Sequence, residues 1–232
     1  MSQLHRLTTP RAAGLAGVLF ALLFGCTIFL IRTALPEGAP PGTQWLDAGS
    51  GRLRVSAILM PFAGICFLWF IGVVRDGFGR YEDRFFASVF LGSGLLFLAM
   101  VFTASAVGVA LVASRGLVAD VTAQSELATF GQTLLMTLTK TYALRMGAVF
   151  MISTATIWLK TGLMPRWLTG MTYAVALVLL IASDVSMWLV LAFPGWVLVV
   201  SLLALARSGI IDLHFGDDEP QAGGSVGQPK RP

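Results

Sequence analysis

The sequence has little charge, and this sets the class of protein. Only 12% of its 232 residues are Asp, Glu, Lys or Arg, about half of the roughly 25% found in an ordinary soluble domain. Hydrophobic residues make up 56% of the chain, and the mean hydropathy is +0.80. These values exclude a soluble cytosolic enzyme. They predict an all-α fold, a polytopic bundle of membrane-spanning helices.

Histidine and cysteine are also scarce, which excludes several kinds of site. His5 and His214 both lie outside the long apolar runs. A bis-His haem, a His-ligated membrane metal and a Ser-His intramembrane protease therefore each lack a required residue. Cys26 and Cys66 form no CxxC motif and cannot build a disulfide framework. We expect no cofactor, no metal site, no catalytic residue and no disulfide, which favours a protein that is not an enzyme.

Long apolar runs give the expected membrane segments. A hydrocarbon core about 30 Å thick takes about 20 residues of helix. Three runs meet this length, and a more polar run and a final run of forty residues follow them. Because the final run is long enough for two crossings, we expect about six transmembrane helices. The runs are Ala13–Ile31, Val55–Val74, Phe85–Ala113, Thr141–Leu159 and Trp167–Ala206.

The segment Val121–Lys140 has two interpretations. It is rich in threonine and only half apolar, with Leu127, Phe130, Leu134 and Leu138 at helical spacing. This pattern is typical of an amphipathic helix that lies in the membrane interface. An extension of the fourth membrane helix has the same pattern, so both interpretations stay open.

The final apolar run needs a turn near its middle. Asp184 lies in a short polar break, whereas Pro194 and Gly195 form a breaker dipeptide. A turn at Asp184 gives two spans of ordinary length and leaves Pro194 as a kink inside the sixth helix. We favour that turn, since neighbouring helices can satisfy the carbonyl that a membrane proline frees.

Basic residues predict the orientation of the chain. With six spans, ten of the 16 Lys and Arg residues fall on one side of the membrane and six on the other. Lys and Arg accumulate in cytoplasmic loops, so we expect both termini on the cytoplasmic side of the membrane. The expected location is a cell membrane, namely the bacterial inner membrane. Residues 1–211 then form a single bundle, and residues 212–232 a disordered cytoplasmic tail. The net charge is +4, and the basic residues are scattered over loops on both faces of the membrane. This distribution favours contact with the lipid bilayer and no nucleic-acid partner.

Small residues recur on one face of the first run. Ala13, Gly17, Ala21 and Gly25 are spaced every fourth residue, which lets another helix approach closely. Packing inside the bundle is favoured. An interface with a membrane-protein partner or a second copy is the alternative.

The fourth run carries the candidate polar site. Thr141, Arg145, Ser153, Thr156 and Lys160 lie within about a third of the helix circumference. They either line a pathway, or the hydroxyls bond their own helix while Arg145 and Lys160 reach opposite interfaces. Asp184, at the junction of the last two spans, has a depth similar to that of Arg145. The candidate site is therefore Arg145, Asp184, Ser153 and Thr156. Arg145 and Asp184 either make a polar contact with each other or reach head groups and water independently.

The C-terminal third resembles known membrane proteins. The runs Leu163–Gly170 and Phe193–Ser201 resemble the last two spans of uncharacterised bacterial six-helix integral membrane proteins. The resemblance implies the same topology and transfers no functional residue.

These observations favour a non-enzymatic accessory or scaffold protein, because small-residue ladders are present and reactive groups are absent. The alternative is a small transporter or channel with a polar path along the fourth helix. A lipid-modifying enzyme is a third hypothesis, and it lacks a visible pair of nucleophile and base.

Overall fold

The computed structural model describes residues 9–34, 44–77, 84–114, 117, 119–162, 164–182 and 187–207. These residues form helices joined by short connections, and no strand occurs among them. The predicted all-α bundle is confirmed. The elements in chain order are α1 (Thr9–Ala34), α2 (Gln44–Gly77), α3 (Arg84–Ser114), α4 (Val121–Met136), the π-helical segment η2 (Thr137–Ala143), α5 (Leu144–Thr161), α6 (Arg166–Ile181), the 3₁₀ segment η3 (Met187–Leu191) and α7 (Ala192–Arg207).

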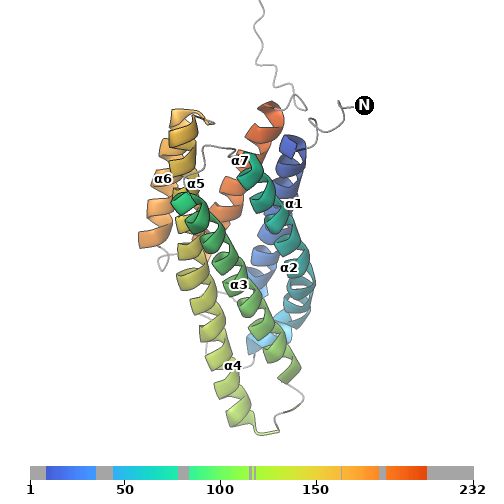
Figure 1. Ribbon diagram of the computed structural model, residues 1–232. Helices are drawn as coiled ribbons and strands as arrows, with labels where there is room; N and C mark the ends of the chain where they lie inside the picture. Colours follow the sequence, from blue (N-terminus) through green and yellow to red (C-terminus); the bar gives the residue numbers. More distant parts are fainter. Residues whose placement is uncertain are drawn as a thin grey trace, which may run out of the picture.

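The helices run up and down in one elongated bundle (Figure 1). The start of α1 and the end of α7 lie at the same end of the bundle, while the start of α4 lies at the opposite end (Figure 1). Successive long helices are antiparallel, which is the arrangement that short connections between membrane helices impose.

Five helical segments in the described part of the chain are long and apolar enough to cross a membrane. The α6 helix is the exception. Its 16 residues extend about 24 Å at 1.5 Å per residue, less than a hydrocarbon core of about 30 Å. The expected six spans therefore correspond to five long segments and one short helix. The long segments are Gly14–Ala34, Gly49–Arg75, Phe85–Ser114, Val121–Thr161 and Trp188–Ala206.

Val121–Lys140 extends the fourth membrane helix and is not a separate interfacial helix. The helical segment runs without a break over 41 residues, Val121–Thr161, or about 60 Å. Asp120 caps its start by accepting hydrogen bonds from the Thr122 and Ala123 amides. Gly131 lies inside this helix and packs closely against α3, where a Cβ on it would overlap Leu111.

Pro194 lies inside the sixth span, Trp188–Ala206, and the expected kink there stays a prediction. The 3₁₀ segment η3 ends at Leu191 and α7 begins at Ala192, which places Pro194 in the first turn of α7. A helix tolerates proline there because the first amides have no partner within the helix. The α6 helix ends at Ile181, just before the expected turn. Asp184 itself lies outside the described residues.

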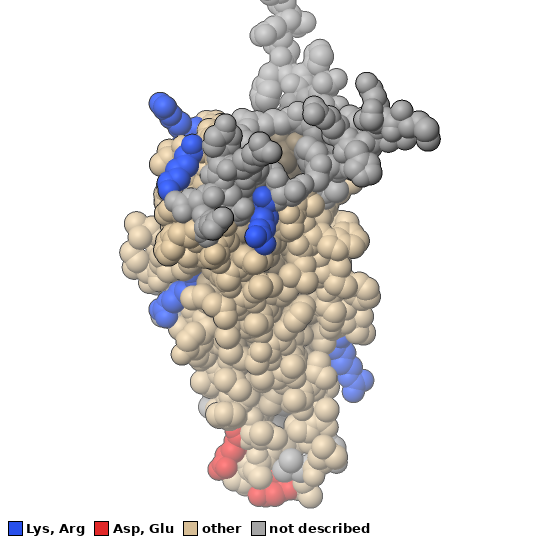
Figure 2. Space-filling view, viewed as in Figure 1, with Lys and Arg blue, Asp and Glu red and all other residues tan. Residues whose placement is uncertain are grey.

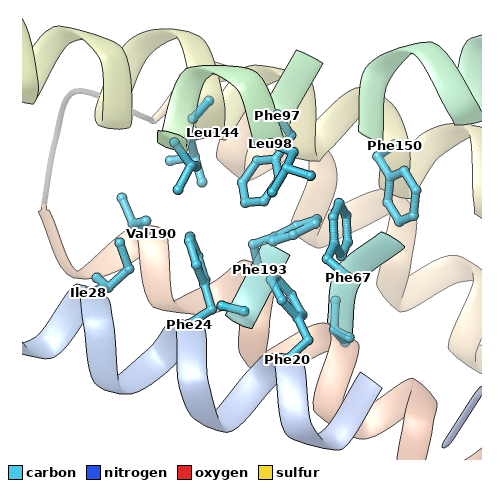
Figure 3. Close-up of a cluster of buried hydrophobic side chains, with 14 of the residues drawn as sticks. Phe20, Phe24, Ile28, Phe67, Phe97, Leu98, Leu144, Phe150, Val190 and Phe193 are labelled. Carbon is cyan, nitrogen blue, oxygen red and sulfur yellow. The ribbon is translucent and has the colours of Figure 1, made fainter. Parts of the chain in front are cut away.

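Phenylalanine rings fill the middle of the bundle. We define the aromatic core as Phe20, Phe24, Phe67, Phe97, Phe150 and Phe193, each at most 1% exposed. Their side chains point toward one another from α1, α2, α3, α5 and α7 (Figure 3). Ring centroids lie 4.5 Å apart for Phe97 and Phe193 and 4.6 Å apart for Phe20 and Phe67. Such ring pairs add about 0.5 to 1.5 kcal/mol each beyond their area burial.

Candidate functional site

Charged residues on α1 and α2 mark the thickness of the membrane. Twenty uncharged residues separate Arg11 from Arg32, and twenty separate Arg54 from Arg75. Each interval extends about 30 Å along a helix, the thickness of a hydrocarbon core. The two helices are antiparallel and in close contact, since a Cβ on Gly49 would lie 2.9 Å from the Ala34 Cβ. We call the two ends of this interval the Arg54 boundary and the Arg75 boundary.

Two cationic residues of the fourth helix lie between these boundaries. A Cβ on Gly108 would lie 3.4 Å from Leu135 and 3.9 Å from Leu53, so Leu135 has about the depth of the Arg54 boundary. Lys140 and Arg145 follow it by five and ten residues, about 7 and 15 Å deeper. Ionisable groups at such depth are costly and mark functional hypotheses.

Lys140 lies on the π-helical segment η2. Single π turns inside α-helices are rare and are frequent at functional sites. The Thr139 hydroxyl donates to the Leu135 carbonyl at 2.6 Å, so this side chain is satisfied within its own helix. Lys140, Thr141 and Arg145 are each half-buried. They place the most polar part of the helix beside the bundle interior.

The hydroxyls farther along the helix bond their own backbone. Ser153 donates to the Val149 carbonyl at 2.9 Å and Thr156 to the Ile152 carbonyl at 2.8 Å. Along the helix, Arg145 and Thr156 are eleven residues apart, about 16 Å. Arg145, Ser153 and Thr156 are therefore not gathered at one point. Because Asp184 lies outside the described residues, its contact with Arg145 stays a prediction.

The structure gives Thr156 and Lys160 partners that the sequence analysis missed. The Thr156 and Tyr173 hydroxyls share a hydrogen bond of 2.7 Å between α5 and α6. The Lys160 Nζ lies 4.5 Å from the centroid of the Phe86 ring on α3. A tyrosine hydroxyl inside an apolar run needs a partner, and this was the signal available for Tyr173.

A second hydrogen bond attaches α6 to α7. The Trp196 indole Nε1 donates to the Thr172 Oγ1 at 3.0 Å, and both residues are buried. Together with the Thr156 and Tyr173 pair, it links the short α6 helix to both α5 and α7. Polar side chains of the last three helices therefore contribute to packing.

The small-residue ladder of α1 has two different environments. A Cβ on Gly17 would overlap the Ser201 Oγ of α7 and lie 2.8 Å from the Phe70 Cδ2 of α2. A Cβ on Gly25 would have no heavy atom within 4 Å. Ala21 is buried, and the Ala13 side chain lies outside the described residues. Gly17 therefore packs inside the bundle and Gly25 does not.

Charge is unevenly distributed over the surface. At the Arg54 boundary, Arg32 is 7% exposed with its guanidinium 3.9 Å from the Met136 sulfur, and Arg52 donates to the Thr33 carbonyl. Acidic side chains gather beyond this boundary, at the end of the bundle where α4 begins, and several basic side chains gather at the opposite end (Figure 2). Those acids are Asp120 and Glu126.

Groups able to hold a metal are absent from the described part of the chain. No cluster of three or more His, Cys, Asp or Glu occurs there, and Cys26 and Cys66 are both free thiols. Comparison with protein families, with curated proteins and with solved structures finds no match to this chain. What can be concluded about its role therefore comes from its geometry, which is that of a multi-pass membrane protein.

Proposed function

We propose that this protein is a non-enzymatic accessory or scaffold protein of the membrane. The aromatic core carries this proposal. Its six buried rings occupy the middle of the bundle and come from five of the helices, where a channel would need a polar, hydrated lining. Such a rigid, filled interior supports binding at the outer surface of the bundle over transport through its axis.

The exposed side of α4 supports the same proposal. Val121–Leu134, which we call the α4 arm, extends about 20 Å beyond the Arg54 boundary. Leu127 is 38% exposed and Phe130 is 66% exposed, although hydrocarbon does not reach this far. Asp120, which caps the start of the arm, and Glu126 on it repel anionic head groups. A helix of a membrane-protein partner is therefore the occupant that fits this apolar stripe.

Photo-crosslinking tests this interface in native membranes. With a photoreactive phenylalanine analogue at Phe130, we expect one discrete protein adduct, because the partner helix covers that position. The substitution Leu127→Gln should abolish the adduct by weakening the same stripe. The same analogue at Leu22, which is 59% exposed on α1, is the lipid-facing control. Identical adducts from both positions, or an adduct that Leu127→Gln leaves intact, would contradict the proposed interface.

A small transporter is the second candidate function. It is favoured by the half-buried Lys140 and Arg145, which lie at hydrocarbon depth beside a π-helical turn. Such a transporter would move a small anion along α5. A measurement of solute flux distinguishes the transporter from the scaffold, because a scaffold protein transports no solute.

We also propose that the protein lies in a bacterial inner membrane, with both termini on the cytoplasmic side. The support is the excess of Lys and Arg in the loops on that side. A reporter enzyme fused after Gly79 should then behave as cytoplasmic, and one fused after Gly116 as extracytoplasmic. The reverse pattern would overturn the orientation while leaving the bundle unchanged.

A further inference from the structure

A groove of about 480 Å³ lies between α2 and α3 on the membrane-facing side of the bundle. Its lining is almost entirely apolar, and Pro61, Phe102 and Val109 in it are exposed. This volume lies in the range of small-ligand sites, about 300 to 1,000 Å³. The lining residues are Ala57, Met60, Pro61, Phe102, Ser105, Ala106, Val109 and Ala110.

Tight helix contacts close the groove at one end. A Cβ on Gly64 would overlap the Phe102 ring, so α2 and α3 meet closely toward the membrane centre. From Phe102 to Ala110 the groove follows α3 for about 12 Å. Toward the Arg54 boundary the lining consists of smaller side chains, Ala57 on α2 and Val109 and Ala110 on α3. The shape fits a linear apolar chain that enters from the head-group side.

Arg54 lies just beyond the end of the groove that Ala57 lines, and is not itself part of the lining. It precedes Ala57 by three residues and Pro61 by seven, which puts all three on one face of α2. It is exposed and has no hydrogen-bond or ion-pair partner among the described residues. Because helical side chains tilt toward the N-terminus, its guanidinium extends away from the groove, into the head-group layer.

Arg52 has a different environment two residues away. A separation of two residues turns the helix by about 200°, so Arg52 lies on another face of α2. Its guanidinium donates to the Thr33 carbonyl at the end of α1. The chain thus offers a matched pair of exposed arginines at nearly the same depth, and only Arg54 shares a helix face with the groove residues Ala57 and Pro61.

Two polar groups lie just inside the mouth of the groove. The Ser105 hydroxyl makes no hydrogen bond to the described residues, whereas that of Thr103 on the same helix donates to the Ala99 carbonyl at 2.8 Å. Pro61 has no N–H, so the Ala57 carbonyl lacks its usual helical donor. Both groups are about 3 to 5 Å deeper than the Arg54 backbone, by their distance along the helices from Leu53 and Gly108.

From this arrangement we infer that the groove binds an anionic phospholipid. One acyl chain lies along Met60, Phe102 and Ala106, and the phosphate binds the Arg54 guanidinium. The glycerol ester region reaches the level of Ser105, whose hydroxyl donates to an ester carbonyl. From the head-group layer inward, the protein presents the Arg54 guanidinium, then the Ser105 hydroxyl and then the apolar groove. A phospholipid has its phosphate, ester and acyl groups in the same order. This inference is independent of the proposed scaffold function.

Native mass spectrometry of the full-length protein in detergent tests the site. The probes are dioleoylphosphatidylglycerol and zwitterionic dioleoylphosphatidylcholine, each titrated separately. We expect one tightly bound phosphatidylglycerol per chain, preferred over phosphatidylcholine by about fivefold. That ratio corresponds to about 1 kcal/mol for one arginine at an anionic membrane surface. Arg54→Gln should remove the preference, and Arg52→Gln should retain it.

The groove itself is tested by Ala106→Leu, which fills it with a larger side chain. This variant should weaken binding of both lipids while the melting temperature stays within about 2 °C of the original. If the fivefold preference survives Arg54→Gln, or falls equally in Arg52→Gln, the head-group assignment is overturned. Undiminished lipid binding in Ala106→Leu would overturn the groove as the acyl site. A lipid-independent dimer that Ala106→Leu disrupts would identify a second copy as the occupant instead.

Discussion

Replacing Phe193 with alanine is expected to lower the free energy of unfolding by about 3 kcal/mol. Phe193 is fully buried, and its ring centroid lies 4.5 Å from that of Phe97 and 5.9 Å from that of Phe67. Its ring also packs on Gly147, where a Cβ would lie 3.1 Å from it. The substitution leaves a cavity bounded by four helices, and rigid neighbouring rings cannot close it.

The estimate for Phe193→Ala lies at the low end of the range for soluble proteins, about 3 to 5 kcal/mol. Helices that separate in a bilayer remain in an apolar medium, so packing is lost while little hydrophobic transfer energy is lost. Thermal or denaturant unfolding in a mild detergent measures the change. Phe29→Ala, at a ring 51% exposed, is the control and should cost less than about 0.5 kcal/mol. Equal losses for the two variants would mean that the aromatic core is not the stabilising centre of the fold.

Replacing Gly17 with alanine is the second substitution with a large expected effect. The added Cβ would overlap the Ser201 Oγ and lie 2.8 Å from the Phe70 Cδ2, so α1 must move away from α2 and α7. Overpacking of this kind costs about 1 to 3 kcal/mol. We expect a loss of about 2 kcal/mol, measured by the same unfolding assay.

The structure offers both a control and a rescue for Gly17→Ala. Gly25→Ala has no heavy atom within 4 Å of its new Cβ, so it should be neutral or stabilising through better helix propensity. Ser201 has a buried Oγ without a hydrogen-bond partner, and Ser201→Ala alone should cost little. Combined with Gly17→Ala, it removes the overlapping atom and should restore at least half of the loss. Failure of this rescue, with Gly25→Ala equally damaging, would contradict the packing of α1 against α7.

Most of the fold could be predicted from local sequence, because the membrane makes local sequence decisive. The uncharged interval Val55–Val74 lies within α2, and Phe85–Ala113 lies within α3. Backbone groups in hydrocarbon must bond within their own segment, so an apolar run of sufficient length can only be a helix. The length of a run thus predicts the element without any knowledge of its neighbours.

Features that depend on neighbouring helices could not be predicted in this way. The sequence left open whether Val121–Lys140 continues the fourth helix, and it did not reveal the close packing of Gly131 against Leu111 of α3. The partner of Thr156 is Tyr173, seventeen residues away on another helix. Helical phasing placed Thr156 on a polar stripe and could not identify the hydroxyl that satisfies it.

The groove between α2 and α3 illustrates the same limit. Pro61 was visible in the sequence as a break in the hydrogen bonding of the second span. The groove also depends on the alanines of α3 that face it, Ala106 and Ala110, and on the contact between Gly64 and Phe102 that closes one end. The register between two helices decides all of these, and one sequence does not reveal that register.

Solute flux across proteoliposomes tests the central claim, that aromatic rings fill the interior and leave no path across the membrane. The purified full-length protein is reconstituted, and release of an entrapped small anion is compared with release from protein-free liposomes of the same composition. We expect equal rates of release for the protein, for its Arg145→Gln variant and for protein-free liposomes. Faster release by the original protein, reduced in Arg145→Gln, would contradict this claim and establish a transport path along α5.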